Sequence, residues 1–221
     1  MIRLVNFILF IEKISDYSKK VIDNGQTPLD IYNLCSIIRE SFCCSYSIRK
    51  NNNLYIYIDS IQCLIKFEGS SLRYLGSDER SQALLLRKAL DKIIGIEKTS
   101  YIGMQKSTPG IFVERLPNGK SVLENIKDLY NDKILIIDEF EKGNTHPNLI
   151  NLQDLDKLSE YCYIFPFPKN TQRAVDFLGM VDDKYKLIYI NLSNIKGIEN
   201  RILYVNFLID QIENSDIERN L

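Results

Sequence analysis

The feature of this sequence that most constrains its fold is a regular alternation of short apolar segments with helical segments in the second half of the chain. Three segments have the length and apolar composition of buried strands, at residues 133–138, 161–167 and 186–191. Helical patterns separate or follow them, near residues 152–160, 171–178 and 198–212. Because parallel strands need long crossover connections, usually helices, this order predicts an α/β fold whose mostly parallel sheet is covered by helices on both faces.

The first half of the chain predicts two helices. The run Thr27-Pro28-Leu29-Asp30 combines a capping hydroxyl, a proline at the first helical position and an early acid, which together mark a helix start. Apolar residues then recur at helical spacing, so we expect this helix to run to about Arg49. A second, long helix with a wide apolar arc is expected after Gly76, with Ser77 as its cap.

Strands are expected on either side of the first helix. The apolar segment 4–11 ends in Glu12-Lys13 without a small-residue cleavage site, so it predicts a buried first strand and not a signal sequence. Residues 54–59 and 61–67 predict two strands joined by a tight turn. No repeat, low-complexity tract or interdomain linker interrupts the 221 residues, which predicts a single α/β domain over residues 1–221.

Charge and cysteine content narrow the classes of function. A formal net charge of −1 excludes a broad basic field, so any contact with RNA must depend on local patches. His146 is the only histidine, which argues against histidine-dependent catalytic triads and multi-histidine metal sites, and no metal is expected. The five cysteines lack a Cys-x-x-Cys pair, which predicts reduced, mostly buried thiols in a cytoplasmic protein. No segment has the ~20 apolar residues needed to cross a membrane.

The glycines indicate how a cofactor would have to bind. All ten are too scattered for a dinucleotide fingerprint or a phosphate loop. A nucleoside-like cofactor would therefore bind through backbone groups of other loops, such as the turns that follow the C-terminal strands.

Two polar motifs have the residue types that catalysis or binding requires. In Ser77-Asp78-Glu79-Arg80, one interpretation is a capped helix start whose charges are solvated. The other is functional, with Arg80 pairing with a phosphate or holding an acid while Asp78 or Glu79 accepts a proton. The second motif, Ser107-Thr108-Pro109-Gly110, is a rigid turn before an apolar strand, and its hydroxyls can also line a polar pocket.

These two motifs, in this order and separated by a helix, resemble the signatures of the archaeal tRNA pseudouridine-54 N(1)-methyltransferases, which belong to the SPOUT class. The matching spans are residues 77–90 and 107–116. Further upstream, Leu29-Asp30 and Ser45-Tyr46-Ser47-Ile48-Arg49 are similar to a leucine-aspartate start and a Ser-x-x-Ile-Arg ending of that family. The resemblance extends from about Pro28 to about Ile137.

The resemblance implies an enzyme that transfers a methyl group from S-adenosylmethionine to N1 of a pseudouridine in the T-loop of tRNA. It also implies a homodimer with a SPOUT-like, mostly parallel sheet and a C-terminal trefoil knot. The N1–H must lose its proton as the nitrogen attacks the methyl group, so a carboxylate is needed nearby. On this interpretation Asp78 accepts the proton and Arg80 positions it or a phosphate. The residues expected to contact RNA are Arg49, Ser107, Thr108 and Arg115.

In the C-terminal part, the resemblance assigns the cofactor to two turns. Where the family has a strand followed by a glycine-aspartate-histidine turn, this chain has Ile137-Asp138, and Gly143 matches the later glycine of the turn. The segment from Ile190 to Asn194 resembles the family's last strand and cofactor loop. The cofactor-binding residues predicted from these two turns are Ile137, Asp138, Gly143, Leu192, Ser193 and Ile198.

The same part of the chain departs from the family at several positions. Acidic residues follow Ile137, and Asn200 and Arg201 replace a histidine and a cysteine near the start of the last helix. Residues 144–190 contain an insertion relative to the family. Two alternatives to the methyltransferase therefore stay open. One is a degenerate relative that binds RNA without cofactor or methyl transfer, and the other is a SPOUT methyltransferase with a different RNA target.

Overall fold

The computed structural model describes residues 4–45, 47–96, 103–116, 135–138, 149–155, 158–166 and 187–219. Its main feature is an eight-stranded sheet with the order β10-β8-β9-β1-β4-β5-β7-β6. The strands are β1 Val5–Ile11, β4 Asn52–Ile58, β5 Cys63–Glu68, β6 Gln105–Thr108, β7 Ile111–Arg115, β8 Leu135–Asp138, β9 Cys162–Pro166 and β10 Leu187–Ile190.

The sheet has a parallel half and an antiparallel half, which meet at β4. The five strands from β10 to β4 are parallel to their neighbours, whereas β5, β7 and β6 are antiparallel to theirs. The predicted mostly parallel α/β sheet is therefore confirmed, whereas its cover by helices on both faces stays a prediction. The predicted hairpin of strands is confirmed as well, since β4 and β5 pair across the short 3-10 helix Asp59–Ile61.

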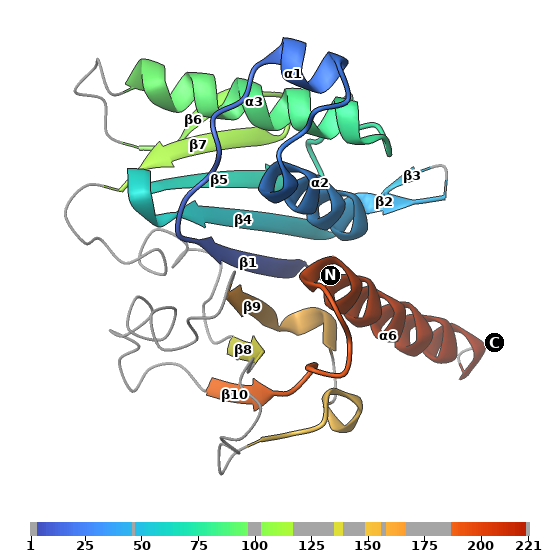
Figure 1. Cartoon of the computed structure of the whole chain (residues 1–221). Coiled ribbons are helices and arrows are strands. Elements are labelled where there is room, and N and C mark those ends of the chain that lie inside the picture. Colours follow the sequence, from blue (N-terminus) through green and yellow to red (C-terminus); the bar gives the residue numbers. More distant parts are fainter. Residues whose placement is uncertain are drawn as a thin grey trace.

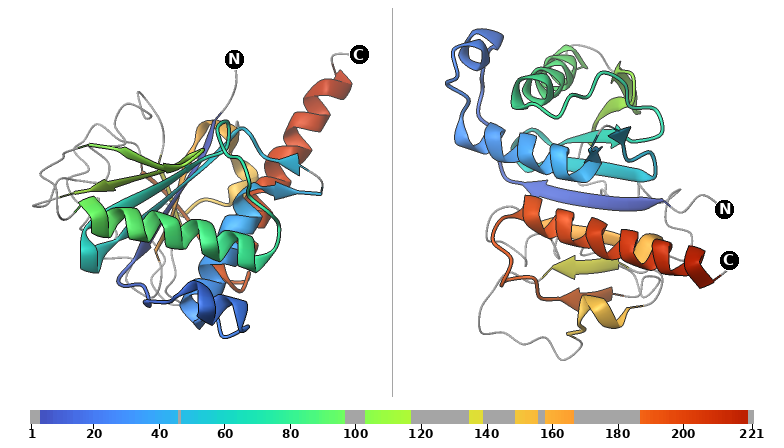
Figure 2. Two further views of the ribbon diagram at one scale, coloured as in Figure 1. Left: turned by 90° about the horizontal axis from the view of Figure 1, so that it is seen from above. Right: turned by 90° about the vertical axis from the view of Figure 1, so that its right-hand side faces the viewer.

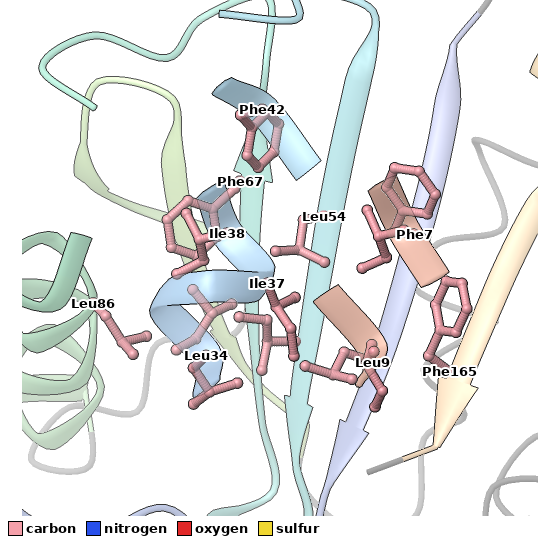
Figure 3. Close-up of a cluster of buried hydrophobic side chains, with 14 of the residues drawn as sticks. Phe7, Leu9, Leu34, Ile37, Ile38, Phe42, Leu54, Phe67, Leu86 and Phe165 are labelled. Carbon is pink, nitrogen blue, oxygen red and sulfur yellow. The ribbon is translucent and has the colours of Figure 1, made fainter. Parts of the chain in front are cut away.

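Four described helices pack on one face of this sheet. They are α1 Lys19–Asp23, α2 Leu29–Phe42, α3 Glu79–Ile96 and α6 Ile198–Arg219. In Figure 1 α3 lies over the antiparallel strands, while α2 and α6 lie side by side near β1. Alternate strand residues such as Phe7, Leu54 and Phe165 join the helices in one core, part of which Figure 3 displays. The opposite face is buried too, at residues such as Ile8 and Tyr55.

Helix α2 ends earlier than predicted. Its last residue is Phe42, because Cys43 adopts an extended conformation with φ −80° and ψ 127°. The chain then forms a short antiparallel hairpin, β2 Cys43–Cys44 with β3 Ser47–Ile48, in which Ser45 has a φ of 44°. The expected capping hydroxyl is also wrong, because Pro28 is the N-cap of α2 and no side chain caps that end.

Other predicted elements were found with altered bounds. The expected helix near residues 152–160 is represented by two 3-10 turns, Leu152–Asp154 and Leu158–Glu160. The last helix is longer than expected, since α6 continues to Arg219. The predicted helix at 171–178 lies outside the described residues, as does most of the 144–190 insertion. The trefoil knot and the single domain over residues 1–221 stay predictions.

A buried polar network attaches α6 to the first half of the chain. The side-chain amide of Asn52, at the start of β4, donates to the Ser41 carbonyl at 2.7 Å and to Asn206 Oδ1 at 3.0 Å. Asn206 in turn donates to the carbonyl of Glu40 at 2.8 Å. One turn further along α6, Asp210 accepts two hydrogen bonds from Arg49. These contacts fix α6 beside α2. The second view in Figure 2 shows how the two helices lie relative to β1.

Candidate cofactor-binding site

An ordered loop lies at the carboxyl ends of β8 and β10. These strands are parallel neighbours, and Ile190 is paired with Asp138 at their ends. Residues 191–197 then lead from β10 into α6, and we call them the 191–197 loop. Ligands of open α/β sheets bind outside the carboxyl ends of parallel strands, so this is the edge where a cofactor is expected.

A buried ion pair on the protein-interior side holds the 191–197 loop in place. Asp138 and Arg201 side chains are 0% and 7% exposed, and Arg201 Nη1 lies 2.7 Å from Asp138 Oδ2. The second carboxylate oxygen of Asp138 accepts a hydrogen bond from the Leu192 N–H at 3.1 Å. Arg201 Nε donates to the Ile195 carbonyl at 2.9 Å. The pair therefore holds the loop at two points, Leu192 and Ile195.

The environment of Asp138 makes its charge dependent on its partner. Burial raises the pKa of Asp138 above its ordinary value, whereas the positive charge of Arg201 and the Leu192 N–H oppose that rise. A carboxylate taken out of water is costly unless it is paired and hydrogen-bonded. Loss of the guanidinium would thus leave a buried charge with one main-chain hydrogen bond among the contacts described.

The 191–197 loop is further ordered by its own hydrogen bonds. The Ser193 N–H donates to Asn191 Oδ1 at 2.8 Å, and the Ile195 N–H donates to the Leu192 carbonyl at 2.8 Å. Gly197 has a φ of 81°, in the left-handed region that glycine adopts most readily. Its carbonyl accepts the Arg201 N–H, which joins the loop to the first turn of α6.

The structure brings several predicted cofactor residues to this turn. Leu192 and Ile198 are buried at either end of the loop, and Ser193 is half-buried within it. Ile137 lies in β8 between Tyr189 and Ile164 of the neighbouring strands. Gly143 lies outside the described residues. Asp138 is at the predicted place, but its carboxylate is turned into the protein and engaged by Arg201.

Arg201 is the functional candidate that sequence reasoning missed. The sequence held a signal, because Arg201 occupies a position in the same helical stripe as Ile198 and Val205, both of which are buried. An arginine in an apolar stripe must find a buried partner. Asp138 and Arg201 are separate departures from the resembled family in the sequence, and the fold makes them partners.

The predicted catalytic residues, Asp78 and Arg80, lie toward the amino ends of the parallel strands. Asp78 caps α3, since its Oδ1 accepts the Ser81 N–H at 2.8 Å, so Asp78 and not Ser77 is the capping residue. The neighbouring Ser77 shares a hollow of about 460 Å³ with residues that precede β4, including Ile48 and Lys50. Arg80 pairs with Asp23 at 2.8 Å. Within one chain, Asp78 is therefore near the amino end of β4, whereas the 191–197 loop follows the carboxyl end of β10.

Three of the four predicted RNA-binding residues lie at the same end of the strands as Asp78, opposite the end that the 191–197 loop follows. Arg49 forms a bidentate ion pair with Asp210. The turn containing Ser107 and Thr108 precedes β7, at the end of that strand which faces the start of β4, and Thr108 Oγ1 is buried without a described hydrogen-bond partner. Arg115 is exposed at the opposite end of β7.

The described residues lack two further kinds of feature. No group of three or more histidine, cysteine, aspartate or glutamate side chains there has an arrangement that would hold a metal ion. In the same ranges, every helix is too short or too polar to cross a membrane. Cys35, Cys63 and Cys162 are buried as predicted, whereas Cys44 is exposed.

Comparison with solved structures addresses the fold. The chain aligns with the crystal structure of Archaeoglobus fulgidus Nep1 bound to S-adenosylhomocysteine, with a TM-score of 0.51 and 10% sequence identity. The alignment covers 97% of this chain and 100% of that one. At this level of identity the likeness shows a shared fold, which is of the SPOUT type.

Comparison with curated proteins finds relatives named tRNA (pseudouridine(54)-N(1))-methyltransferase. That of Methanocaldococcus jannaschii is 32% identical over 117 residues, which are 52% of this chain and 56% of the relative. That of Haloferax volcanii is 35% identical over 103 residues, 46% and 48% of the two chains. The chain thus spans about half the length of these relatives. That of Methanococcoides burtonii is 25% identical over 226 residues, 98% and 96% of the two chains.

Comparison with family models gives a match over more than half of the chain. Residues 15–145 match a family described as putative SAM-dependent RNA methyltransferase. This range begins after β1, contains β2 to β8 and reaches past Asp138 at the end of β8. The chain therefore belongs to the family of putative SAM-dependent RNA methyltransferases.

Proposed function

We propose that this protein transfers a methyl group from S-adenosylmethionine to N1 of a pseudouridine at position 54 of tRNA. The observation that carries the proposal is the family match over residues 15–145, to which the relatives named for this reaction add the substrate. The ordered turn at the carboxyl ends of β8 and β10 supports it physically. We further propose that the protein acts in the cytoplasm.

The described residues fit a nucleoside-containing cofactor at the 191–197 loop. Asp138 is fully buried and paired, so its charge is not directed toward a ligand at this edge. The loop instead offers main-chain groups and the Ser193 hydroxyl, which are suited to an adenine and a ribose, while the buried Leu192 and Ile198 anchor its two ends in the core. Bound there, S-adenosylmethionine would supply an electrophilic methyl group. Ile137, Asp138 and Gly143 belong to the other turn of the proposed site.

The proton on N1 of the pseudouridine needs an acceptor, and we assign Asp78 to this role with Arg80 beside it. In one chain, Asp78 lies near the amino ends of the parallel strands, and the 191–197 loop follows their carboxyl ends. A second copy of the chain would therefore have to bring its Asp78 to the loop of the first. The assignment of Asp78 thus requires the homodimer, which we propose as the active form.

The surface of α6 supports such a dimer. Leu203 and Phe207 lie one turn apart on this helix and are 46% and 51% exposed. The partly buried Tyr204 and Leu208 continue the same stripe. Exposed apolar side chains that gather on one helix face are typical of association surfaces.

Phe207→Lys should weaken this association, because a desolvated ammonium would replace an apolar ring in the interface. We expect sedimentation velocity to detect a shift from dimer toward monomer at micromolar concentration. The matched control is Ile94→Lys on α3, where an apolar side chain is 50% exposed and the dimer should persist. A Phe207→Lys variant that remains fully dimeric would remove α6 as the interface.

Asp78→Asn separates the catalytic role of Asp78 from its capping role. Asparagine caps helices about as well as aspartate, so the helix should keep its stability while the proton acceptor is lost. We expect methyl transfer to fall by about 10²-fold or more, the usual range for loss of a general base. Asp78→Ala should show the same loss and also lower the free energy of unfolding by about 1 kcal/mol. Full activity in Asp78→Asn would show that Asp78 caps α3 and does not accept the proton.

The proposed function is tested by calorimetry and by a matched pair of RNA substrates. S-adenosylhomocysteine should bind with micromolar affinity, and a T-loop RNA with pseudouridine at position 54 should accept methyl, whereas uridine there should not. Cofactor binding with transfer to another site would favour a different RNA target. If the protein binds tRNA but not S-adenosylhomocysteine, the result would favour a degenerate relative that binds RNA without methyl transfer, and it would overturn the proposal.

A further inference from the structure

We propose that Arg201 is a positioning residue for the cofactor, acting through the 191–197 loop together with Asp138. This inference rests on the proposed use of S-adenosylmethionine and adds a residue and a physical role to it. Arg201 is 7% exposed on its side chain and lies below the loop, so it would act without touching the cofactor.

The geometry of the contacts makes the pair a clamp on the loop. Arg201 Nε binds the Ile195 carbonyl and Nη1 binds Asp138, so two separate edges of one guanidinium are used. Asp138 passes the restraint on to the Leu192 N–H. Three hydrogen bonds thereby connect the end of β8, both ends of the Leu192–Ile195 turn and the first turn of α6.

The planar shape of the guanidinium is essential to this arrangement. Its five N–H donors have fixed directions, which allows one side chain to meet a carbonyl and a carboxylate at once. A lysine ammonium at the same position would keep the positive charge and neutralise Asp138. Because it is a point charge at the end of a flexible chain, it would hold one of the two partners less rigidly.

A preformed loop matters because ligand binding otherwise costs the free energy of ordering it. Main-chain groups bind a nucleoside well only when they are already in place, and supporting contacts from buried residues keep them there. The contacts made by Arg201 and Asp138 restrain the loop in the absence of any ligand. The affinity for the cofactor should therefore depend on Arg201.

The test compares Arg201→Lys with wild type by two measurements. Amide hydrogen exchange, followed by NMR without ligand, reports the Leu192 and Ile195 N–H groups directly. Calorimetry with S-adenosylhomocysteine reports the affinity. We expect the Leu192 amide to exchange at least about tenfold faster and the cofactor to bind at least about tenfold more weakly, with the fold retained. The matched control is Arg87→Lys on α3, which replaces an arginine that pairs with Asp16 and Asp91 and donates to the Tyr17 carbonyl, and it should change neither quantity.

The outcomes distinguish this inference from the proposed function. Unchanged affinity in Arg201→Lys, with or without faster exchange at Leu192, would overturn the positioning role. If wild type does not bind S-adenosylhomocysteine, the proposed function fails, and faster exchange in the variant would still show the clamp on the loop. Should Arg201→Lys fail to fold, Asp138→Asn provides the second variant. It keeps an acceptor for the Leu192 N–H but places an NH2 donor opposite Arg201 Nη1, so the hydrogen bond between the two side chains is lost. A wild-type affinity would again contradict the inference.

Discussion

Replacing Arg201 by methionine should lower the free energy of unfolding by about 3–5 kcal/mol, the usual cost of removing one partner from a buried ion pair. Methionine fills a similar volume, so the loss comes from the unpaired charge of Asp138 and not from a cavity. The contact of Arg201 with the Ile195 carbonyl is lost as well. Urea unfolding of the variant at neutral pH measures the effect.

Asp138→Asn in the Arg201→Met background should recover much of this stability. The amide needs no counter-charge and can still accept the Leu192 N–H. A double variant that is less stable than Arg201→Met alone would contradict this explanation.

Acid should also reduce the defect of Arg201→Met. The charge of Arg201 and its hydrogen bond both lower the pKa of Asp138. Without them, burial raises the pKa of Asp138 further above its ordinary value. The folded state then binds a proton at a higher pH than the unfolded state does, so the stability of the variant should rise as the pH falls from about 7 toward about 4. A deficit that stays constant over this range would show that charge burial is not its cause.

Gly110→Ala should have an effect of similar size, for a reason of backbone geometry. Gly110 has a φ of 78°, and a Cβ placed there would lie 2.4 Å from the Leu72 nitrogen and 2.6 Å from the Ser71 carbonyl carbon. The left-handed conformation and the clash with main chain each cost about 1–3 kcal/mol, so we expect a loss of about 3 kcal/mol or more. Thermal unfolding checks this value.

Gly25→Ala is the control that isolates the clash. Gly25 has a φ of 68°, and nothing lies within 4 Å of the position that a Cβ would occupy. Only the left-handed conformation is then penalised, at about 1–2 kcal/mol. Equal losses in the two variants would show that the contact with Leu72 is relieved by a small shift of the chain.

Local chemistry predicted the elements whose signals lie within a few residues. Two short apolar runs separated by a tight turn located β4 and β5, and the Pro109-Gly110 pair predicted a turn, at which the structure gives Gly110 a φ of 78°. The early end of α2 was missed because the Cys43–Ile48 hairpin is specified by pairing across a turn, whereas apolar spacing continues through it. The start of α3 was placed within one or two residues, but the cap was assigned to Ser77 when the carboxylate of Asp78 makes the contact.

The candidate site was less predictable because its parts are brought together by the fold. Asp138 and Arg201 are 63 positions apart, and Arg49 and Asp210 are 161 apart. No local pattern specifies such partners. The resemblance assigned the cofactor to the turns that follow β8 and β10 and the proton acceptor to Asp78. Within one chain these positions lie at opposite ends of the parallel strands.

The central position of β1 has a consequence for how the chain is made. One edge of β1 pairs with β4, which follows within the first 58 residues, whereas the other edge pairs with β9, which ends at residue 166. During synthesis the first edge can be satisfied early, together with α2 and the β4–β5 hairpin. The second edge, with Phe7 that later contacts Tyr163 and Phe165, must wait for a much longer nascent chain. We therefore expect ribosome-bound chains that end before β9 to need chaperones, because they present an open strand edge beside an incomplete aromatic cluster.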